Sequence, residues 1–224
     1  MAQQTARAGL TGSALVRLLA GLAGPQGPAR EPRASFADGL SQWTGWTDAI
    51  ALSAALERPI PLMTAADGGV ERGGARAAFG QVRAQQAQAI EREAQAVGRS
   101  PLESGLGFSP YRQLYWARQQ AMDGAIGTLR EQVRAALAAC TPELARLAAV
   151  DAVMAQALAG QERRLLAAVP VLLEKHYQRL RAAQPEGADG WLDAFRHDLQ
   201  AVLLAELELR LQPVEGLVEA LPTH

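Results

Sequence analysis

A single helical pattern runs from Ser109 to about Gln184, and it constrains the fold more than any other feature of this chain. Apolar side chains in its first half recur at steps of three and four residues, as they do on the buried face of a long helix. Thr141, Pro142 and Glu143 then supply a cap, a first-turn proline and an early acid, so a second helix begins there. Two long helices joined by so short a turn must fold back on each other. The stripe of the first helix consists of Tyr111, Tyr115, Arg118, Met122, Ile126, Leu129, Val133, Leu137 and Cys140.

The remaining helices are predicted from the same apolar spacing. Pro170 predicts a bend near 166–170, because a proline removes one backbone donor. Pro213 is expected to end the last long helix, with one further apolar turn over 214–221. No segment shows strand alternation, so the predicted fold is all-α: an elongated helical bundle built on a long antiparallel helical hairpin, with a third long C-terminal helix. The predicted helices cover about 10–22, 35–56, 76–97, 109–139, 142–183 and 191–211.

The stripes also predict which side chains form the core. We expect Leu129, Met154 and Leu203 to be buried, one on each long helix. Cys140 ends the first stripe, which predicts a packed thiol rather than a nucleophile. On the second long helix the inward positions are expected to be Leu147, Val150, Met154, Leu158, Leu165, Leu172, His176 and Leu180.

Composition divides the chain into three parts. Residues 1–57 are predicted to form an N-terminal helical arm, 58–75 a flexible loop rich in glycine and proline, and 76–224 the helical bundle. The helix over 10–22 carries leucines on one side and is followed by a Gly/Pro linker. It must therefore either fold back onto the bundle, which is the default, or insert into a groove elsewhere.

Charge and cysteine content favour a soluble, cytoplasmic protein. The net charge is −1, but residues 1–185 carry 20 basic and 15 acidic side chains, whereas residues 186–224 carry 2 and 8. Arginine outnumbers lysine by 21 to 1 and asparagine is absent, which indicates a GC-rich genome rather than nucleic-acid binding. Cys140 is the only cysteine, so no intrachain disulfide can form, and the apolar run 14–20 is far too short for a membrane span.

The sequence contains no motif of a known chemistry. With one lysine, Lys175, and no glycine-rich loop before it, a P-loop is excluded, and GxGxxG, HExxH, GxSxG and CxxC are absent. Asp193 and His197 stand four residues apart on one helix face and could share a metal or a proton, but a surface ion pair is favoured. An enzyme would need a cluster across helices, for example Asp48, Asp193 and His197. We expect no catalytic residue, no metal and no cofactor.

The candidate interaction residues are basic or aromatic. A nucleic-acid regulator would use the basic face Arg163 to Arg181, but this face lacks interleaved aromatics and has the acidic last helix as a nearby counter-surface, so nucleic acid is disfavoured. Trp46 and Trp116 step off their stripes and could anchor a partner. The aromatic residues near each of them suggest that the two helices meet. The predicted interaction residues are Trp46, Trp116, Arg163, Arg164 and Arg179.

Five segments carry a resemblance to a known family: SQWTGWTDAIALSAAL (41–56), PYRQLYWARQQAM (110–122), RLAAVDAVMAQAL (146–158), LLEKHYQRLR (172–181) and WLDAFRHDLQAVLLAELELRLQPVEGLVEAL (191–221). They closely resemble an uncharacterised family of bacterial proteins, a domain of unknown function found mainly in beta- and gammaproteobacteria. That family has no assigned activity, so the resemblance implies no catalytic residue. It implies genomic neighbours instead, since such proteins tend to be encoded beside a proton-channel protein of the flagellar-stator and TolQ type and an OmpA-like envelope protein.

Taken together, these observations favour a non-catalytic helical interaction or scaffold protein. Its expected partners are components of such an envelope system or a second copy of the chain. The alternatives are the nucleic-acid regulator and an enzyme whose site is assembled across helices.

Overall fold

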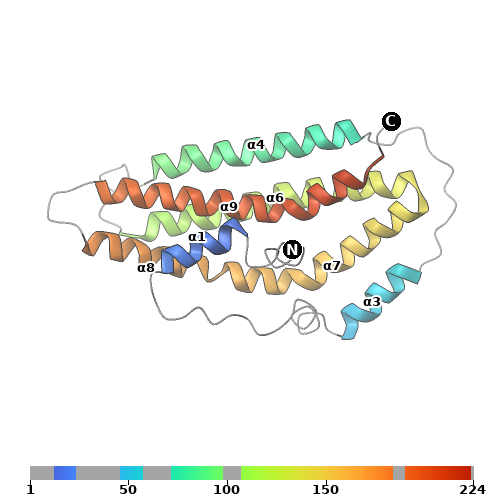
Figure 1. Ribbon diagram of the computed structural model, residues 1–224, viewed down its shortest axis with the longest axis horizontal. Coiled ribbons are helices and arrows are strands. Elements are labelled where there is room, and N and C mark those ends of the chain that lie inside the picture. Colours follow the sequence, from blue (N-terminus) through green and yellow to red (C-terminus); the bar gives the residue numbers. More distant parts are fainter. Residues whose placement is uncertain (1–12, 24–45, 58–71, 98–106, 184–189, 223–224) are drawn as a thin grey trace, which may run out of the picture. The chain divides into compact units, whose positions relative to one another are not determined.

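The computed structural model describes residues 13–23, 46–57, 72–97, 107–183 and 190–222, and within these ranges the chain forms helices and no strand (Figure 1). The predicted all-α class is confirmed for that part of the chain. The helices are α1 (Ala14–Ala23), α3 (Trp46–Glu57), α4 (Arg72–Ala96), α6 (Ser109–Cys140), α7 (Pro142–Leu166), α8 (Val169–Ala182) and α9 (Gly190–Ala220).

Contacts between residues group the chain into two compact units, each assembled from segments that are distant in sequence. Unit 1 comprises Met1–Gly27, Arg83–Gly124 and Ala168–Gln212, and unit 2 comprises Pro28–Val82, Ala125–Ala167 and Pro213–His224. Unit 1 therefore holds α1 and α8, unit 2 holds α3 and α7, and α4, α6 and α9 contribute residues to both. The expected division into an arm, a loop and a bundle stays a prediction.

Aromatic rings form the centre of unit 1. Tyr111 on α6, Tyr177 on α8 and Phe195 on α9 are buried, and their ring centroids lie 5.1–5.7 Å apart. Phe108, immediately before α6, and Trp191 on α9 extend this cluster. Edge-to-face contacts of this kind stabilise a core beyond the apolar area that they bury. The predicted burial of Leu203 on α9 is confirmed, and it belongs to a stripe of fully buried side chains: Phe195, Leu199, Leu203 and Leu207.

The N-terminal helix folds back within unit 1, as expected by default. α1 lies against α8 and buries Leu15 and Leu22, which are seven residues apart and so share one face (Figure 1). Of the predicted helix over 10–22, the first three residues lie outside the described residues.

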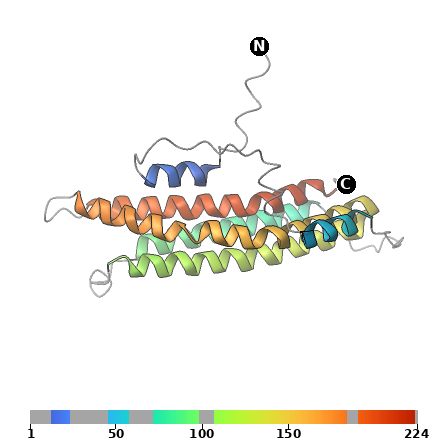
Figure 2. The ribbon, with the colours of Figure 1, turned by 90° about the horizontal axis from the view of Figure 1, so that it is seen from below.

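Unit 2 has a core of small and aliphatic side chains. The stripe of α6 is buried here as predicted at Ile126, Leu129, Val133 and Leu137. α3 lies against α7 (Figure 2), yet none of its described side chains is fully buried. The rest of the predicted helix over 35–56, before Trp46, lies outside the described residues.

The predicted inward face of α7 is wrong in part. Leu147 and Leu165 are exposed and Met154 is only half-buried, whereas Ala148 and Leu166 are buried. The prediction assumed one helix over 142–183, but α7 ends at Leu166 and α8 begins a new stripe. That stripe consists of Val169, Pro170, Leu173, His176 and Tyr177.

Proline accounts for this break as predicted. Pro170 lies in the first turn of α8, where its missing N–H costs least, and residues 167–168 form a turn between the two helices. The Ala167 N–H still donates to Arg163 O at 2.9 Å, so the hydrogen bonds of α7 continue into this turn.

The end of α9 corrects a prediction. Pro213 does not end the helix, which continues to Ala220 with Pro213 inside it. An interior proline costs about 3 kcal/mol, and fully burying one leucine or valine contributes about 1.5–3 kcal/mol. Four buried side chains after the proline outweigh its cost: Val214, Leu217, Val218 and Leu221.

Two smaller boundaries also differ. α4 begins at Arg72 rather than at residue 76, so the last four residues of the expected loop 58–75 are helical, while 58–71 lie outside the described residues. The Arg72 guanidinium donates to the Glu219 carbonyl within unit 2. Cys140 is half-buried rather than fully packed, and its thiol donates to Ala136 O at 3.2 Å.

The turn between α6 and α7 forms as the sequence indicates. The Thr141 hydroxyl accepts from the Leu144 amide at 3.3 Å. Hydrogen bonds from the backbone amide of Glu143 and, second, from the Thr141 hydroxyl hold the pKa of the Glu143 carboxyl below its ordinary value. Asp151 on α7 accepts from Arg130 and Arg134 on α6 at 2.8 and 2.7 Å. These contacts join the two helices near their turn, and the full-length hairpin with a third helix packed on it stays a prediction.

Candidate functional site

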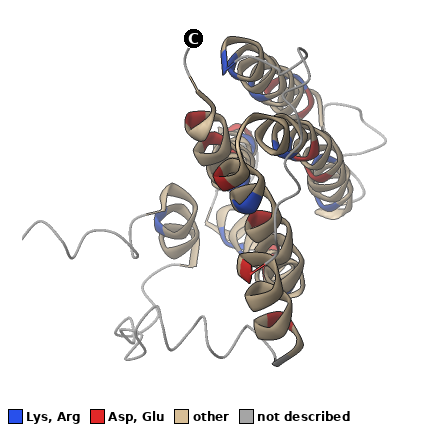
Figure 3. Cartoon of the chain, turned by 90° about the vertical axis from the view of Figure 1, so that its right-hand side faces the viewer, with Lys and Arg blue, Asp and Glu red and all other residues tan. Residues whose placement is uncertain are grey.

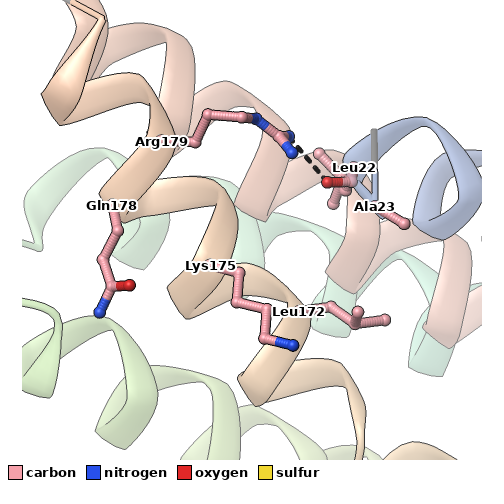
Figure 4. A pocket seen from close by; sticks show the side chains of 6 residues that line it. All are labelled: Leu22, Ala23, Leu172, Lys175, Gln178 and Arg179. Carbon is pink, nitrogen blue, oxygen red and sulfur yellow. Dashed lines mark hydrogen bonds between the residues drawn. The ribbon is translucent and has the colours of Figure 1, made fainter. Parts of the chain in front are cut away.

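A pocket of about 340 Å³ lies in unit 1, where α1 rests on α8. It combines apolar side chains from both helices with two cationic side chains from α8 (Figure 4). Its volume is at the lower end of the range typical of small-ligand sites. We call it the α1–α8 pocket, and it is lined by Leu22, Ala23, Leu172, Lys175, Gln178 and Arg179.

Helical periodicity places these side chains. Lys175 and Arg179 are four residues apart and therefore neighbours on one face of α8. Leu173, His176 and Tyr177 occupy the opposite, buried face. The buried stripe thus holds α8 in the unit and turns its cationic stripe toward α1.

Arg179 connects the two helices directly. Its Nη2 group donates to the Leu22 carbonyl at 2.7 Å (Figure 4) and also to His176 Nδ1 at 2.9 Å. Leu22 lies in the last turn of α1, where backbone carbonyls lack partners within the helix and the helix end is partly negative. Arg179 therefore serves as a cap for α1.

The tautomer of His176 follows from this contact. A guanidinium cannot accept a hydrogen bond, so Nδ1 is the acceptor and the ring proton is on Nε2. Nε2 donates to Asp198 Oδ2 at 2.7 Å, and the ring also lies against Phe195. Both nitrogens of this buried imidazole are thus hydrogen-bonded. The series of hydrogen bonds that positions α1 therefore runs through Asp198, His176, Arg179 and Leu22.

Lys175 differs from the arginine beside it. Its side chain is exposed, and among the described residues no hydrogen bond or ion pair engages its ammonium group. The pocket therefore combines one unpaired cation, one partly used guanidinium and an apolar wall. Such a surface can bind an anion, and no group in it is arranged as a nucleophile with a base.

A second polar cluster of unit 1 is fully enclosed. Glu206 on α9 is completely buried and accepts from Tyr115, from Gln119 Nε2 at 3.0 Å and from Arg210 Nε at 2.9 Å. Burial raises the pKa of Tyr115 far above its ordinary value, and the charge and hydrogen bond of Glu206 add to this effect. Every member is satisfied, so the cluster fixes the register of α6 against α9.

The ion-pair cluster of unit 2 is less enclosed. Burial raises the pKa of Asp151, but the hydrogen bonds and charges of Arg130 and Arg134 outweigh burial and leave this pKa below its ordinary value. Asp151 is thus an ionised carboxylate held between two guanidinium groups. This arrangement stabilises the α6–α7 turn and leaves no open position for a substrate.

The structure distributes the predicted interaction residues over both units. Trp116 lies in unit 1 with 51% of its surface exposed, as expected for a residue off its stripe. Arg163 and Arg164 are exposed in the last turn of α7, in unit 2, whereas Arg179 belongs to unit 1 and caps α1. Trp46 begins α3, and its side chain lies outside the described residues.

The sequence also suggested two alternative sites, a catalytic cluster across helices and a basic face for nucleic acid. Asp48 belongs to unit 2 and the other two members of the postulated enzyme cluster to unit 1, where Asp193 accepts from Arg196 at 2.8 Å and His197 is exposed. The described residues contain no group of three His, Cys, Asp or Glu side chains that could hold a metal ion. For nucleic acid, Figure 3 shows acidic and basic residues interspersed along the helices.

Sequence reasoning missed the most enclosed polar residues. Glu206 lies one position before Leu207 on a leucine-rich helix, next to the stripe, and an acid at such a place signals a buried partner. His176 was placed inward correctly, but nothing local identified Asp198 or Arg179 as its partners.

Comparison with known proteins now places the chain. It belongs to the family described as Protein of unknown function (DUF3348), whose model matches residues 1–223. No curated protein and no solved structure matches it. None of the helices that the structure describes combines the length and hydropathy needed to cross a bilayer.

Proposed function

We propose that this chain is a non-catalytic helical interaction protein that binds a partner protein through α1 and α8 of unit 1. The observation that carries this proposal is that each of these two helices leaves an aliphatic side chain exposed, on α8 with a cation beside it. Val16 on α1 and Val171 on α8 expose 51% and 53% of their surfaces, and Val171 is one turn from the unpaired Lys175. We call these three residues the α1–α8 face.

The physical reason is that such a surface gains by being covered. Exposed aliphatic side chains contribute free energy when a partner removes them from water, and a cation at the edge adds specificity for an acidic partner. Trp116, exposed in the same unit, is the kind of residue that dominates binding energy at interfaces.

For the partner, we propose a component of a proton-channel and OmpA-like envelope system, with this chain on the cytoplasmic side. The resemblance described above supports this choice, and the single cysteine fits a reducing compartment. A second copy of the chain is the competing occupant.

Site-specific photo-crosslinking in the native organism tests the proposal. A benzophenone amino acid in place of Val171 should give one major adduct, identified by mass spectrometry as an envelope-system component. The matched control is the same amino acid in place of Leu165, which is equally exposed but lies in unit 2. An adduct with a second copy would replace the partner by self-association, and adducts only from position 165 would move the interface to unit 2.

A further inference from the structure

Among the residues that the structure describes, no carboxylate neutralises the positive charge of the α1–α8 pocket, whereas other arginines of unit 1 are paired with acids. Arg83, Arg112, Arg118 and Arg196 each pair with a carboxylate within 3.0 Å. No carboxylate of the described residues pairs with Lys175 or Arg179. Glu174, the acid next to Lys175 in sequence, is taken by Arg112 at 2.6 Å.

Arg179 retains donors for a ligand. A guanidinium has five N–H groups, and the two on Nη2 serve Leu22 and His176. Those on Nε and Nη1 remain. Asp198 is separated from Arg179 by the neutral imidazole of His176, so its charge is directed at the ring and not at the pocket.

The rest of the pocket is suited to a hydrocarbon. Leu22 and Ala23 from the end of α1 and Leu172 from α8 provide its apolar wall. A volume of about 340 Å³ offers room for roughly ten water-sized groups. Figure 4 shows Leu172 and Lys175 on the side of α8 that faces α1, next to Arg179.

From this arrangement we infer that the α1–α8 pocket binds a small amphipathic anion: a carboxylate or phosphate group carried on a short alkyl chain. The oxyanion lies between the Lys175 ammonium and the free N–H groups of Arg179, and the alkyl chain lies against Leu22 and Leu172. Because this ligand also touches α1, its binding stabilises the contact between α1 and α8. This goes beyond the proposed partner and depends only on the pocket.

Titration of the purified full-length chain with octanoate and with octyl phosphate tests the inference, followed by the methyl NMR signals of Leu22 and Leu172 and by calorimetry. Saturable shifts of both methyl groups are expected with at least one of the two anions, and the tighter one identifies the head group. Lys175→Gln should weaken that binding about tenfold, since a charge-assisted hydrogen bond is lost. The matched control Arg181→Gln removes an exposed charge of the same helix outside the pocket and should leave binding unchanged.

Octanol and inorganic phosphate separate the two halves of the ligand, and each should bind more weakly than the amphipathic anion. The inference is overturned if neither anion binds, if octanol binds as well as octanoate, or if Lys175→Gln and Arg181→Gln behave alike. Because only small ligands and purified protein are used, these outcomes are independent of the partner proposed for the α1–α8 face.

Discussion

Unit 1 and unit 2 are stabilised by different kinds of interior. In unit 1, α8 buries five of its 14 residues, among them Tyr177 and His176, against the rings of Tyr111 and Phe195. In unit 2, α7 buries only Ala148 and Leu166 over 25 residues, and α3 buries none of its described side chains. A short helix with large side chains is therefore anchored more firmly than a longer one rich in alanine.

The two units also differ in how completely they bury their charged groups. Unit 1 encloses Glu206 completely and satisfies it with three donors, whereas Asp151 of unit 2 remains partly accessible between Arg130 and Arg134. A buried polar group costs free energy unless its partners are in place, so the network of unit 1 selects one helix register. The comparison teaches that unit 1 is the more specifically packed unit, and that α3 and α7 are held by fewer buried side chains.

The largest expected effect is the loss of the aromatic centre of unit 1. Phe195→Ala should lower the free energy of unfolding by about 4 kcal/mol, because it removes a fully buried ring with several ring neighbours. In unit 2, Leu129→Ala should cost about 3 kcal/mol, and the exposed Leu165→Ala less than about 0.5 kcal/mol. Urea denaturation followed by circular dichroism measures all three, and equal losses for Phe195→Ala and Leu165→Ala would contradict the contrast.

Removing the buried charge comes next. Glu206→Gln keeps the size of the side chain but leaves Tyr115 and Arg210 without their anionic acceptor, which should cost about 3 kcal/mol. Glu208→Gln is the control on the same helix, because its ion pair with Arg83 is exposed and should contribute no more than about 1 kcal/mol. If both variants unfold at the same urea concentration, the enclosed network does not set the stability of unit 1.

A smaller and local effect is expected at the cap of α1. Arg179→Ala removes the donor to the Leu22 carbonyl and should weaken the attachment of α1 by about 1–2 kcal/mol. Hydrogen exchange should become faster in α1 and stay unchanged at the centre of α9. Arg181→Ala should alter neither, and unchanged exchange in the Arg179 variant would show that Leu15 and Leu22 alone hold the helix.

The smallest effect is the acid response of unit 2. The pKa of Asp151 is lower in the folded protein than its ordinary value of 3.8, so its contribution is complete above that value and is lost as the pH falls through the folded pKa. Between about pH 6 and pH 3 the wild-type protein should therefore lose more stability than Asp151→Asn, which has no carboxyl to titrate there. Urea denaturation of both proteins at the two pH values measures this. An equal loss of stability in both proteins would mean that the two arginines do not lower the pKa of Asp151 in the folded protein.

Much of the helical framework was predictable from local pattern. The stripe of α6 from Tyr111 to Leu137, the cap at Thr141 and the break near Pro170 each depend on residues close in sequence, and each is observed. Burial of Leu203 was predicted for the same reason, since helical spacing assigns it to one face together with its neighbours.

The spacing of apolar residues could not predict whether a local conformational cost is outweighed by burial against distant segments. Pro213 disfavours helix locally, yet α9 continues because the side chains after it are buried by other segments. Leu165 is a residue type common in cores, yet it is exposed beside the buried Leu166 at the point where α7 ends. Residue type states what a side chain gains by burial, and the packing partners decide whether burial occurs.

The candidate site was likewise predictable only in part. The sequence alone determined an all-α chain, the inward position of His176 and a basic stretch from Arg163 to Arg181 that includes Lys175 and Arg179. Only the tertiary structure decided that α1 folds back onto α8, that Arg179 is occupied by Leu22 and His176, and that Lys175 is left beside a pocket. The bond between Arg179 and Leu22 joins residues 157 positions apart, and a hydrogen bond between such distant residues depends on three-dimensional geometry that helical periodicity does not encode.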